Sequence, residues 1–109
     1  LTGSIPTSLG VLTKLKYLYM DGNSLIKTIP NSLGSLSSLL TLGLYSNSLT
    51  GIVPFELCGE KYLQFLSLHD NPLTCYASCL TTVHESYFGN VAMCPNPTTG
   101  KLKYSAPEI

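Results

Sequence analysis

Hydrophobic and polar positions in this chain repeat with a fixed period of 24 residues. Within each repeat, the two apolar residues of an L-x-L step face the same side of a short predicted strand, because side chains alternate along a strand. One coil cannot bury its own leucines, whereas stacked coils bury them in continuous columns. The pattern therefore predicts a solenoid whose core is formed by these columns: Leu15, Leu39, Leu63; Leu18, Leu42, Leu66; Met20, Leu44, Leu68; and Leu1, Leu25, Leu49, Leu73.

The other half of each repeat carries an Ile-Pro or Val-Pro pair followed by a leucine. Proline fixes φ and removes a backbone donor, so it disfavours a continued strand ladder and predicts short helical turns around residues 7–9 and 31–33. An asparagine recurs where the chain leaves each strand, at Asn23, Asn47 and Asn71. Its amide both donates and accepts, so we predict a structural role in pairing backbone groups of adjacent coils.

Residues 1–74 combine an L-x-x-L-x-L-x-x-N-x-L pattern with an L-T-G-x-I-P segment, and this combination resembles the plant-specific class of leucine-rich repeats. That class includes ectodomains of receptor-like kinases, receptor-like proteins without a kinase, and polygalacturonase-inhibiting proteins. The resemblance implies an α/β repeat fold, a right-handed solenoid with a parallel concave β-sheet and short convex 3-10 or helical turns. It also implies a second, smaller sheet. The second repeat departs from the pattern, because Ile26 and Lys27 stand where threonine and glycine are usual.

The fourth copy of the repeat contains cysteines instead of an Ile-Pro segment, and we interpret residues 75–96 as a C-terminal cap. A solenoid end exposes its apolar column unless a cap covers it. Within the cap we predict a short helix over residues 76–84 and a last edge strand around Val91 and Met93, beside Leu66 and Leu68. Residues 97–109 are proline-rich and are interpreted as a tail or linker.

The spacing of the four cysteines predicts two disulfide bonds. Cys79 lies about one helical turn before the position 24 residues after Cys58, which favours a Cys58–Cys79 bridge and leaves Cys75 for Cys94. A zinc site of Cys75, Cys79, His84 and Cys94 has suitable atoms, but its spacing is not the common C-x2-C and it leaves Cys58 over. Free thiols are the third possibility. Disulfides would indicate an oxidising environment, outside the cell or at its surface.

The sequence is compatible with more than one source lineage. Plant members of the class usually close with a different cysteine pairing, and many carry an N-x-[S/T] glycosylation sequon, which this chain lacks. The cap therefore departs from the plant pattern, and a repeat protein of an oomycete, an alga or a fungus is an alternative.

Composition argues against nucleic-acid binding and catalysis. The net charge is zero, all six basic residues are lysine, and no basic stripe is present, whereas nucleic-acid binders need one. His69 and Asp70 are adjacent, but neighbours on a strand point to opposite faces, and neither a nucleophile motif nor a glycine-rich phosphate loop accompanies them. We therefore predict no enzymatic activity, no cofactor and no metal.

The variable positions between the core leucines form the expected concave face. Aromatic residues with a few polar groups are typical of interface centres, although aromatics also pack as cross-strand neighbours without any ligand. We predict recognition of a protein or peptide ligand by a fragment of a cell-surface receptor-like or secreted inhibitor-like protein. The predicted ligand-binding residues are Tyr17, Tyr19, Asp21, Tyr45, Phe65, His69 and Asp70.

The sequence is also compatible with two alternatives to this recognition function. The piece is either a structural end of a longer solenoid without ligand contact, or the end of a receptor-kinase ectodomain whose kinase domain is absent here. The first coil has nothing stacked before it, so its apolar edge is also expected to self-associate. That edge comprises Leu1, Ile5, Leu9, Leu12 and Leu15.

Overall fold

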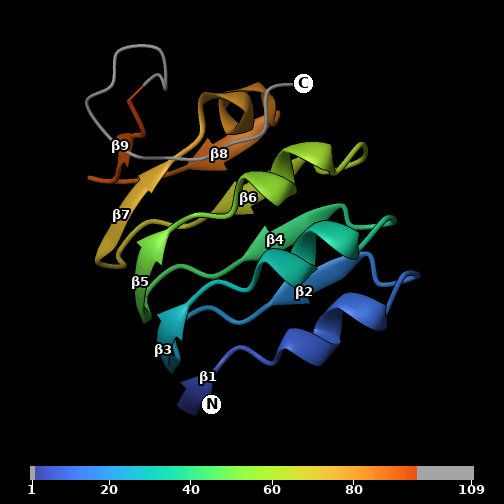
Figure 1. Cartoon of the computed structure of the whole chain (residues 1–109), viewed down its shortest axis with the longest axis horizontal. Helices are drawn as coiled ribbons and strands as arrows, with labels where there is room; N and C mark the ends of the chain where they lie inside the picture. The colour runs from blue at the N-terminus through green and yellow to red at the C-terminus, as the bar shows by residue number, and fades with distance from the viewer. Residues whose placement is uncertain (1, 96–109) are drawn as a thin grey trace.

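The computed structural model describes residues 2–95, so Leu1 and the predicted tail or linker at 97–109 lie outside the described residues. The chain winds in stacked coils, and successive coils add one parallel strand to each of two sheets (Figure 1). One sheet has the order β2-β4-β6-β8 and consists of Tyr17–Tyr19, Thr41–Gly43, Phe65–Ser67 and Glu85–Tyr87. The other has the order β1-β3-β5-β7-β9 and consists of Thr2–Ser4, Ser24–Thr28, Ser48–Ile52, Leu73–Tyr76 and Ala92–Met93.

Within residues 2–95, four 3-10 helices connect the two sheets: η1 (Thr7–Val11), η2 (Asn31–Ser35), η3 (Phe55–Gly59) and η4 (Ser78–Thr82). Pro6, Pro30 and Pro54 stand in extended conformation just before the first three helices. This agrees with the short turns expected after each Ile-Pro or Val-Pro pair, because proline has the fixed φ of a helix start and loses no needed donor there.

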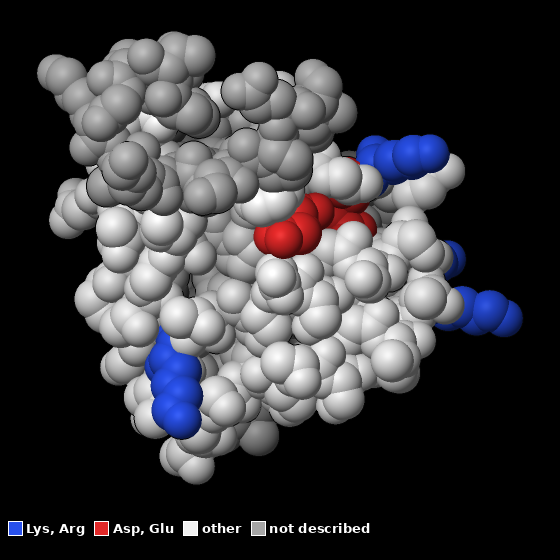
Figure 2. Space-filling view, viewed as in Figure 1, with Lys and Arg blue, Asp and Glu red and all other residues white. Residues whose placement is uncertain are grey.

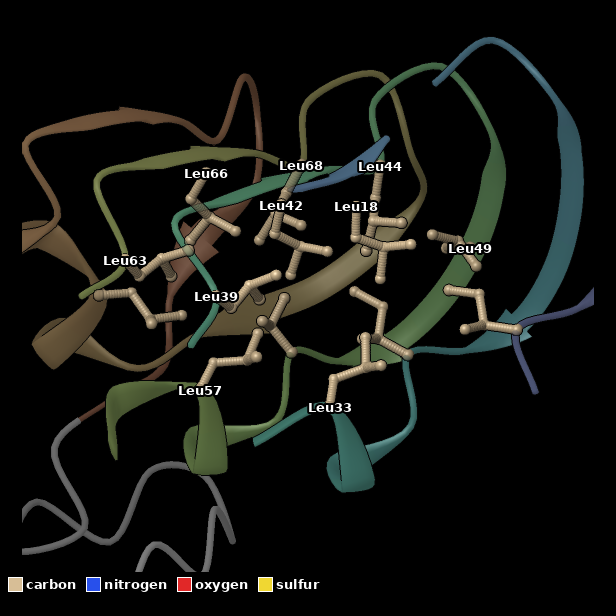
Figure 3. Close-up of a cluster of buried hydrophobic side chains, with 14 of the residues drawn as sticks. Leu18, Leu33, Leu39, Leu42, Leu44, Leu49, Leu57, Leu63, Leu66 and Leu68 are labelled. Carbon is tan, nitrogen blue, oxygen red and sulfur yellow. The ribbon is translucent and has the colours of Figure 1, made fainter. Parts of the chain in front are cut away.

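The core consists of the leucine columns between the two sheets and the helices (Figure 3). In the four-stranded sheet Leu18, Leu42 and Leu66 are register partners on β2, β4 and β6. Leu42 and Leu66 are completely buried, and Leu18 on the edge strand is 8% exposed. The 24-residue period therefore places one leucine of each coil directly above the leucine of the preceding coil.

Asparagine side chains join the coils where the strands end. Asn47 Oδ1 accepts a hydrogen bond from the Leu25 N–H (3.1 Å), and its Nδ2 donates to the carbonyls of Met20 and Leu44, at 3.0 Å each. Asn71 repeats the arrangement one coil later, with Leu49 N–H as its donor (3.0 Å). Backbone groups that leave the strand ladder are thereby paired rather than buried without a partner.

Two disulfides close the C-terminal end. They join Cys58 to Cys79 and Cys75 to Cys94, with Cα–Cα distances of 5.8 and 4.9 Å. This is the pairing expected from the spacing, and it uses all four cysteines, so the alternative zinc site loses its thiolate ligands.

The cap differs from the expectation in two respects. The helix expected over residues 76–84 is instead the end of β7 followed by the shorter η4. The last strand, β9, pairs with β7 and not with β6, which carries Leu66 and ends just before Leu68. That place is taken by β8, whose Ser86 is the register partner of Leu66. The final coil is 20 residues long rather than 24, so extrapolating the period put the wrong segment beside β6.

In the described part of the chain the second sheet is not the smaller one, because it has five strands where the concave sheet has four. This sheet stays regular at the second repeat, where Ile26 and Lys27 replace the usual threonine and glycine. Lys27 adopts φ 69° at the place where Gly3 and Gly51 adopt φ 83°, and β3 still pairs on both sides. The left-handed backbone that glycine adopts freely is therefore imposed on a lysine at this coil.

Candidate ligand-binding face

The outward side of the four-stranded sheet carries the residues that were expected to bind a ligand. Tyr17 and Tyr19 stand on the edge strand β2 and are 57% and 62% exposed. Their register partners on β4 are Thr41 and Gly43, and both are buried. The small residues of β4 therefore separate the two β2 tyrosines from the aromatic residues farther along the sheet.

Asp21 occupies the space that Gly43 leaves open. A Cβ at Gly43 would lie 2.8 Å from either carboxylate oxygen of Asp21. Asp21 Oδ1 accepts a hydrogen bond from the Tyr45 N–H at 3.1 Å. The carboxylate is thus tied to the next coil, and it brings a negative charge beside the start of the loop that carries Tyr45.

Four rings on β4, β6 and β8 and their following loops form what we call the aromatic cluster: Tyr45, Phe65, His69 and Tyr87. The Tyr45 and His69 rings are stacked, with centroids 4.7 Å apart and an interplanar angle of 2°. Tyr87 lies 5.6 Å from Phe65 and 6.1 Å from His69, in tilted geometry. Ring pairs at these separations are attractive beyond their buried area. The structure thus brings three of the predicted residues together, and adds Tyr87.

Sequence reasoning missed Tyr87. It lies in the cap, and the 24-residue period aligned it with Leu63, a core position. In the structure it is the register partner of Ser67 and is 45% exposed. The alternation of Glu85, Ser86 and Tyr87 before a Phe-Gly-Asn turn was the available signal for a strand with two outward side chains.

Polar atoms without partners lie within the cluster. Ser67 is the position between Phe65 and His69 on the outward side, it is 1% exposed, and its Oγ has no hydrogen-bond partner in the structure. Nδ1 of His69 is likewise buried and unpaired. Buried polar groups are nearly always paired with protein or water, so two unpaired atoms in one cluster are unusual.

Carboxylates flank the cluster. Tyr87 donates its hydroxyl hydrogen to Glu85 Oε2 at 3.1 Å. This hydrogen bond and the negative charge of Glu85 raise the pKa of Tyr87 above its usual value. Asp70 is exposed and has φ 60°, in the left-handed region that aspartate and asparagine tolerate best among non-glycine residues.

His69 and Asp70 do not form a catalytic pair in this arrangement. The His69 ring lies against Tyr45, and Gly89 packs on its other end, where an added Cβ would be 2.8 Å from His69 Cβ. Nδ1 of His69 has no hydrogen-bond partner, so Asp70 does not orient the ring through this atom. Among residues 2–95, moreover, no group of three histidine, cysteine or acidic side chains is placed to hold a metal ion.

One titratable group away from this face has a strongly shifted pKa. Glu60 follows η3, at the position that Leu12 and Leu36 occupy after η1 and η2. It is only 9% exposed, and burial raises its pKa to about 7, partly opposed by a hydrogen bond from the Leu36 backbone. The face in view in Figure 2 is mostly uncharged, with acidic atoms gathered near its middle and lysines at its margins.

None of the helices in the described part of the chain has the length and apolar character needed to cross a bilayer.

Comparison with known proteins places this geometry in context. The sequence model described as leucine rich repeat matches residues 13–73. No curated protein is significantly similar to the chain in sequence. Many solved structures resemble it, and three of them are described next.

The BIR3–SERK2 complex from Arabidopsis thaliana is 28% identical, with a TM-score of 0.73 over 87% of this chain. The ectodomain of the Arabidopsis thaliana membrane receptor kinase GASSHO1/SCHENGEN3, in complex with CASPARIAN STRIP INTEGRITY FACTOR 2, is 38% identical, with a TM-score of 0.72 over 75%. The plant peptide hormone receptor RGFR1, in complex with RGF2, is 33% identical, with a TM-score of 0.75 over 82%. The chain spans 56%, 10% and 15% of these three structures, respectively.

Proposed function

Since the chain belongs to the leucine-rich repeat family, we propose that it is a non-catalytic module that recognises a protein or peptide through its four-stranded sheet. The aromatic cluster is the observation that carries this proposal. Tyr45 and Tyr87 are 40% and 45% exposed while their rings contact His69. Rigid, partly exposed aromatic residues supply large contact area at low entropic cost, which is what interface centres use.

Two further observations support it. The similar structures include a receptor kinase ectodomain and a peptide hormone receptor, each in complex with a named factor. The two disulfides fit an oxidising environment, which supports a place outside the cell or at its surface. The parent protein proposed here is accordingly a receptor-like or secreted inhibitor-like leucine-rich-repeat protein.

Selection from a random peptide library displayed on phage tests the proposal. The wild-type chain, with its disulfides intact, is expected to enrich peptides whose binding is lost when Tyr45 and Tyr87 are both changed to alanine. Tyr62→Ala is the matched control, because Tyr62 is 60% exposed but lies before β6 and outside the sheet. Failure of the wild-type chain to enrich any peptide, or equal binding by the double variant, would contradict the proposal.

A second candidate function rests on the first coil. Val11 and Leu12 are 76% and 46% exposed and line a shallow hollow of about 400 Å³ together with residues 13–15. An apolar edge of this kind suits stacking against another coil, either of a longer solenoid or of a second copy. Sedimentation of the chain between 5 and 500 µM (about a hundredfold range) tests self-association. A constant monomer mass over this range would count against a second copy. If a larger species forms, Leu12→Ser should weaken it, because the equivalent Leu36 of the second coil is completely buried.

A further inference from the structure

The groups around the aromatic cluster are acceptors of hydrogen bonds and carriers of negative charge. Asp21 accepts a hydrogen bond from the Tyr45 N–H and Glu85 accepts one from the Tyr87 hydroxyl, so carboxylates lie beside two of its rings. Asp70, which follows His69 in the chain, is exposed. The donor of Tyr87 is already used by Glu85. A ligand that satisfies this set must bring donors, and preferably positive charge.

No described lysine competes for these carboxylates from within the sheet. The four described lysines lie in the connections before β2 and β6 or on β3 of the other sheet: Lys14, Lys16, Lys27 and Lys61. Lys16 comes nearest in sequence, but it precedes β2, at the opposite edge of the sheet from β8. Over the cluster the local charge is therefore negative, although the whole chain has a net charge of zero.

The aromatic rings of the cluster also favour a cationic ligand. A guanidinium or ammonium group placed over an aromatic face is attracted by the ring quadrupole. Tyr45 and Tyr87 each keep part of their surface open, and Glu85 stands beside the Tyr87 hydroxyl. A cation over Tyr87 would meet an aromatic face and a carboxylate at the same time.

We infer that the aromatic cluster selects a cationic side chain, arginine or lysine, of the ligand. The inference rests on the proposed function and specifies the chemistry of the bound segment. The observation that distinguishes this site from an ordinary row of packed aromatics is the pairing of Tyr87 with Glu85. The Tyr87 side chain is 45% exposed, and its hydroxyl is hydrogen-bonded to a carboxylate.

Titration with two defined probes tests the inference. One is a blocked hexapeptide that alternates arginine with glycine, and the other is its glutamate counterpart. Both are followed by amide NMR shifts and by tyrosine fluorescence, since the chain has no tryptophan. The arginine peptide is expected to bind at least about tenfold more tightly and to perturb β6 and β8, with affinity falling as salt rises. Equal affinity for both peptides, or no binding of the arginine peptide, would overturn the inference.

Variants separate ring and charge contributions. Tyr87→Leu keeps apolar bulk on β8 but removes the ring face and is expected to weaken the arginine peptide about fivefold or more. Glu85→Gln and Asp70→Asn keep hydrogen bonding and, for Asn, the left-handed backbone, and each is expected to cost about threefold. Glu56→Gln on η3 is the matched control and should change nothing. Wild-type affinity in Tyr87→Leu, with the fold verified by circular dichroism, would refute the assignment of this ring.

The outcome also distinguishes this inference from the proposed function. If the phage selection enriches peptides without arginine or lysine that still require Tyr45 and Tyr87, recognition by this face stands and its cationic preference is wrong. If no peptide of any composition is enriched, both fail.

Discussion

Replacing Glu60 by leucine should stabilise the chain and remove part of its pH dependence. Glu60 interrupts a column in which the first two coils have Leu12 and Leu36 at the residue closing the 3-10 helix. Its side chain is 9% exposed, and Oε2 has no partner in the structure. A carboxylate at this place loses its hydration without gaining a counter-ion, so the ionised form is disfavoured in the folded state.

The magnitude follows from the pKa of Glu60, which burial raises from 4.5 to about 7. Each tenfold change in the acid constant corresponds to about 1.4 kcal/mol, so ionising Glu60 in the folded chain costs about 3 kcal/mol. Because the folded pKa lies above the unfolded one, the folded state binds this proton more tightly. The stabilisation that comes from this tighter proton binding is fully present below pH 4.5. It is lost as the pH rises through about 7, where folded Glu60 ionises.

Urea unfolding at pH 4.5 and pH 8, with both disulfides intact, measures the effect. Glu60→Leu should raise the free energy of unfolding by about 3 kcal/mol more at pH 8 than at pH 4.5, relative to wild type. Glu60→Gln should also remove the pH-dependent part, while Glu56→Gln on the same 3-10 helix should leave it in place. An equal difference from wild type at both pH values would refute the reasoning, because it would mean that Glu60 titrates as a solvated group.

Four further changes test the fold. Lys27→Gly should raise the free energy of unfolding by up to about 1 kcal/mol in a denaturant titration, because glycine adopts the left-handed backbone without the strain that a lysine side chain causes. Gly51→Ala, at the equivalent position, should lower the free energy of unfolding by about 1–2 kcal/mol. Asn47→Ala should cost about 2–4 kcal/mol by leaving backbone groups of two coils unpaired, and a loss below 1 kcal/mol would contradict that role. Serine at both Cys58 and Cys79 removes a link across 21 residues and should cost about 3 kcal/mol in a thermal or urea unfolding experiment.

Much of the fold was predictable because it depends on a repeated local pattern. Leu42 and Leu66 occupy the core since each coil places the same residue at the same height, and no long-range information is needed to deduce that. Cys58 and Cys79 are predictable for the same reason, as equivalent positions of adjacent coils come close. The pattern fails in the last coil, whose shorter length puts β8 where the period expected Val91 and Met93.

The candidate face was predictable only as a set of outward positions. Strand alternation identifies Tyr45, Phe65 and His69 as outward residues, but it cannot say which rings meet. Contact depends on the small side chains beside them: Gly43 admits the Asp21 carboxylate, and Ser67 leaves room for the rings around it. Tyr87 enters the cluster through the cap, whose register no repeat defined.

The sequence by itself determined the solenoid, the direction in which its leucines point and the asparagines that join its coils, because these follow from a period that each coil satisfies locally. The tertiary structure decided where the solenoid ends and what its surface offers. β8 completes the concave sheet, Tyr87 joins three predicted residues, and Ser67 is buried without a partner. These features arise from the meeting of non-equivalent coils. A repeat pattern carries no information about positions where one coil differs from the next.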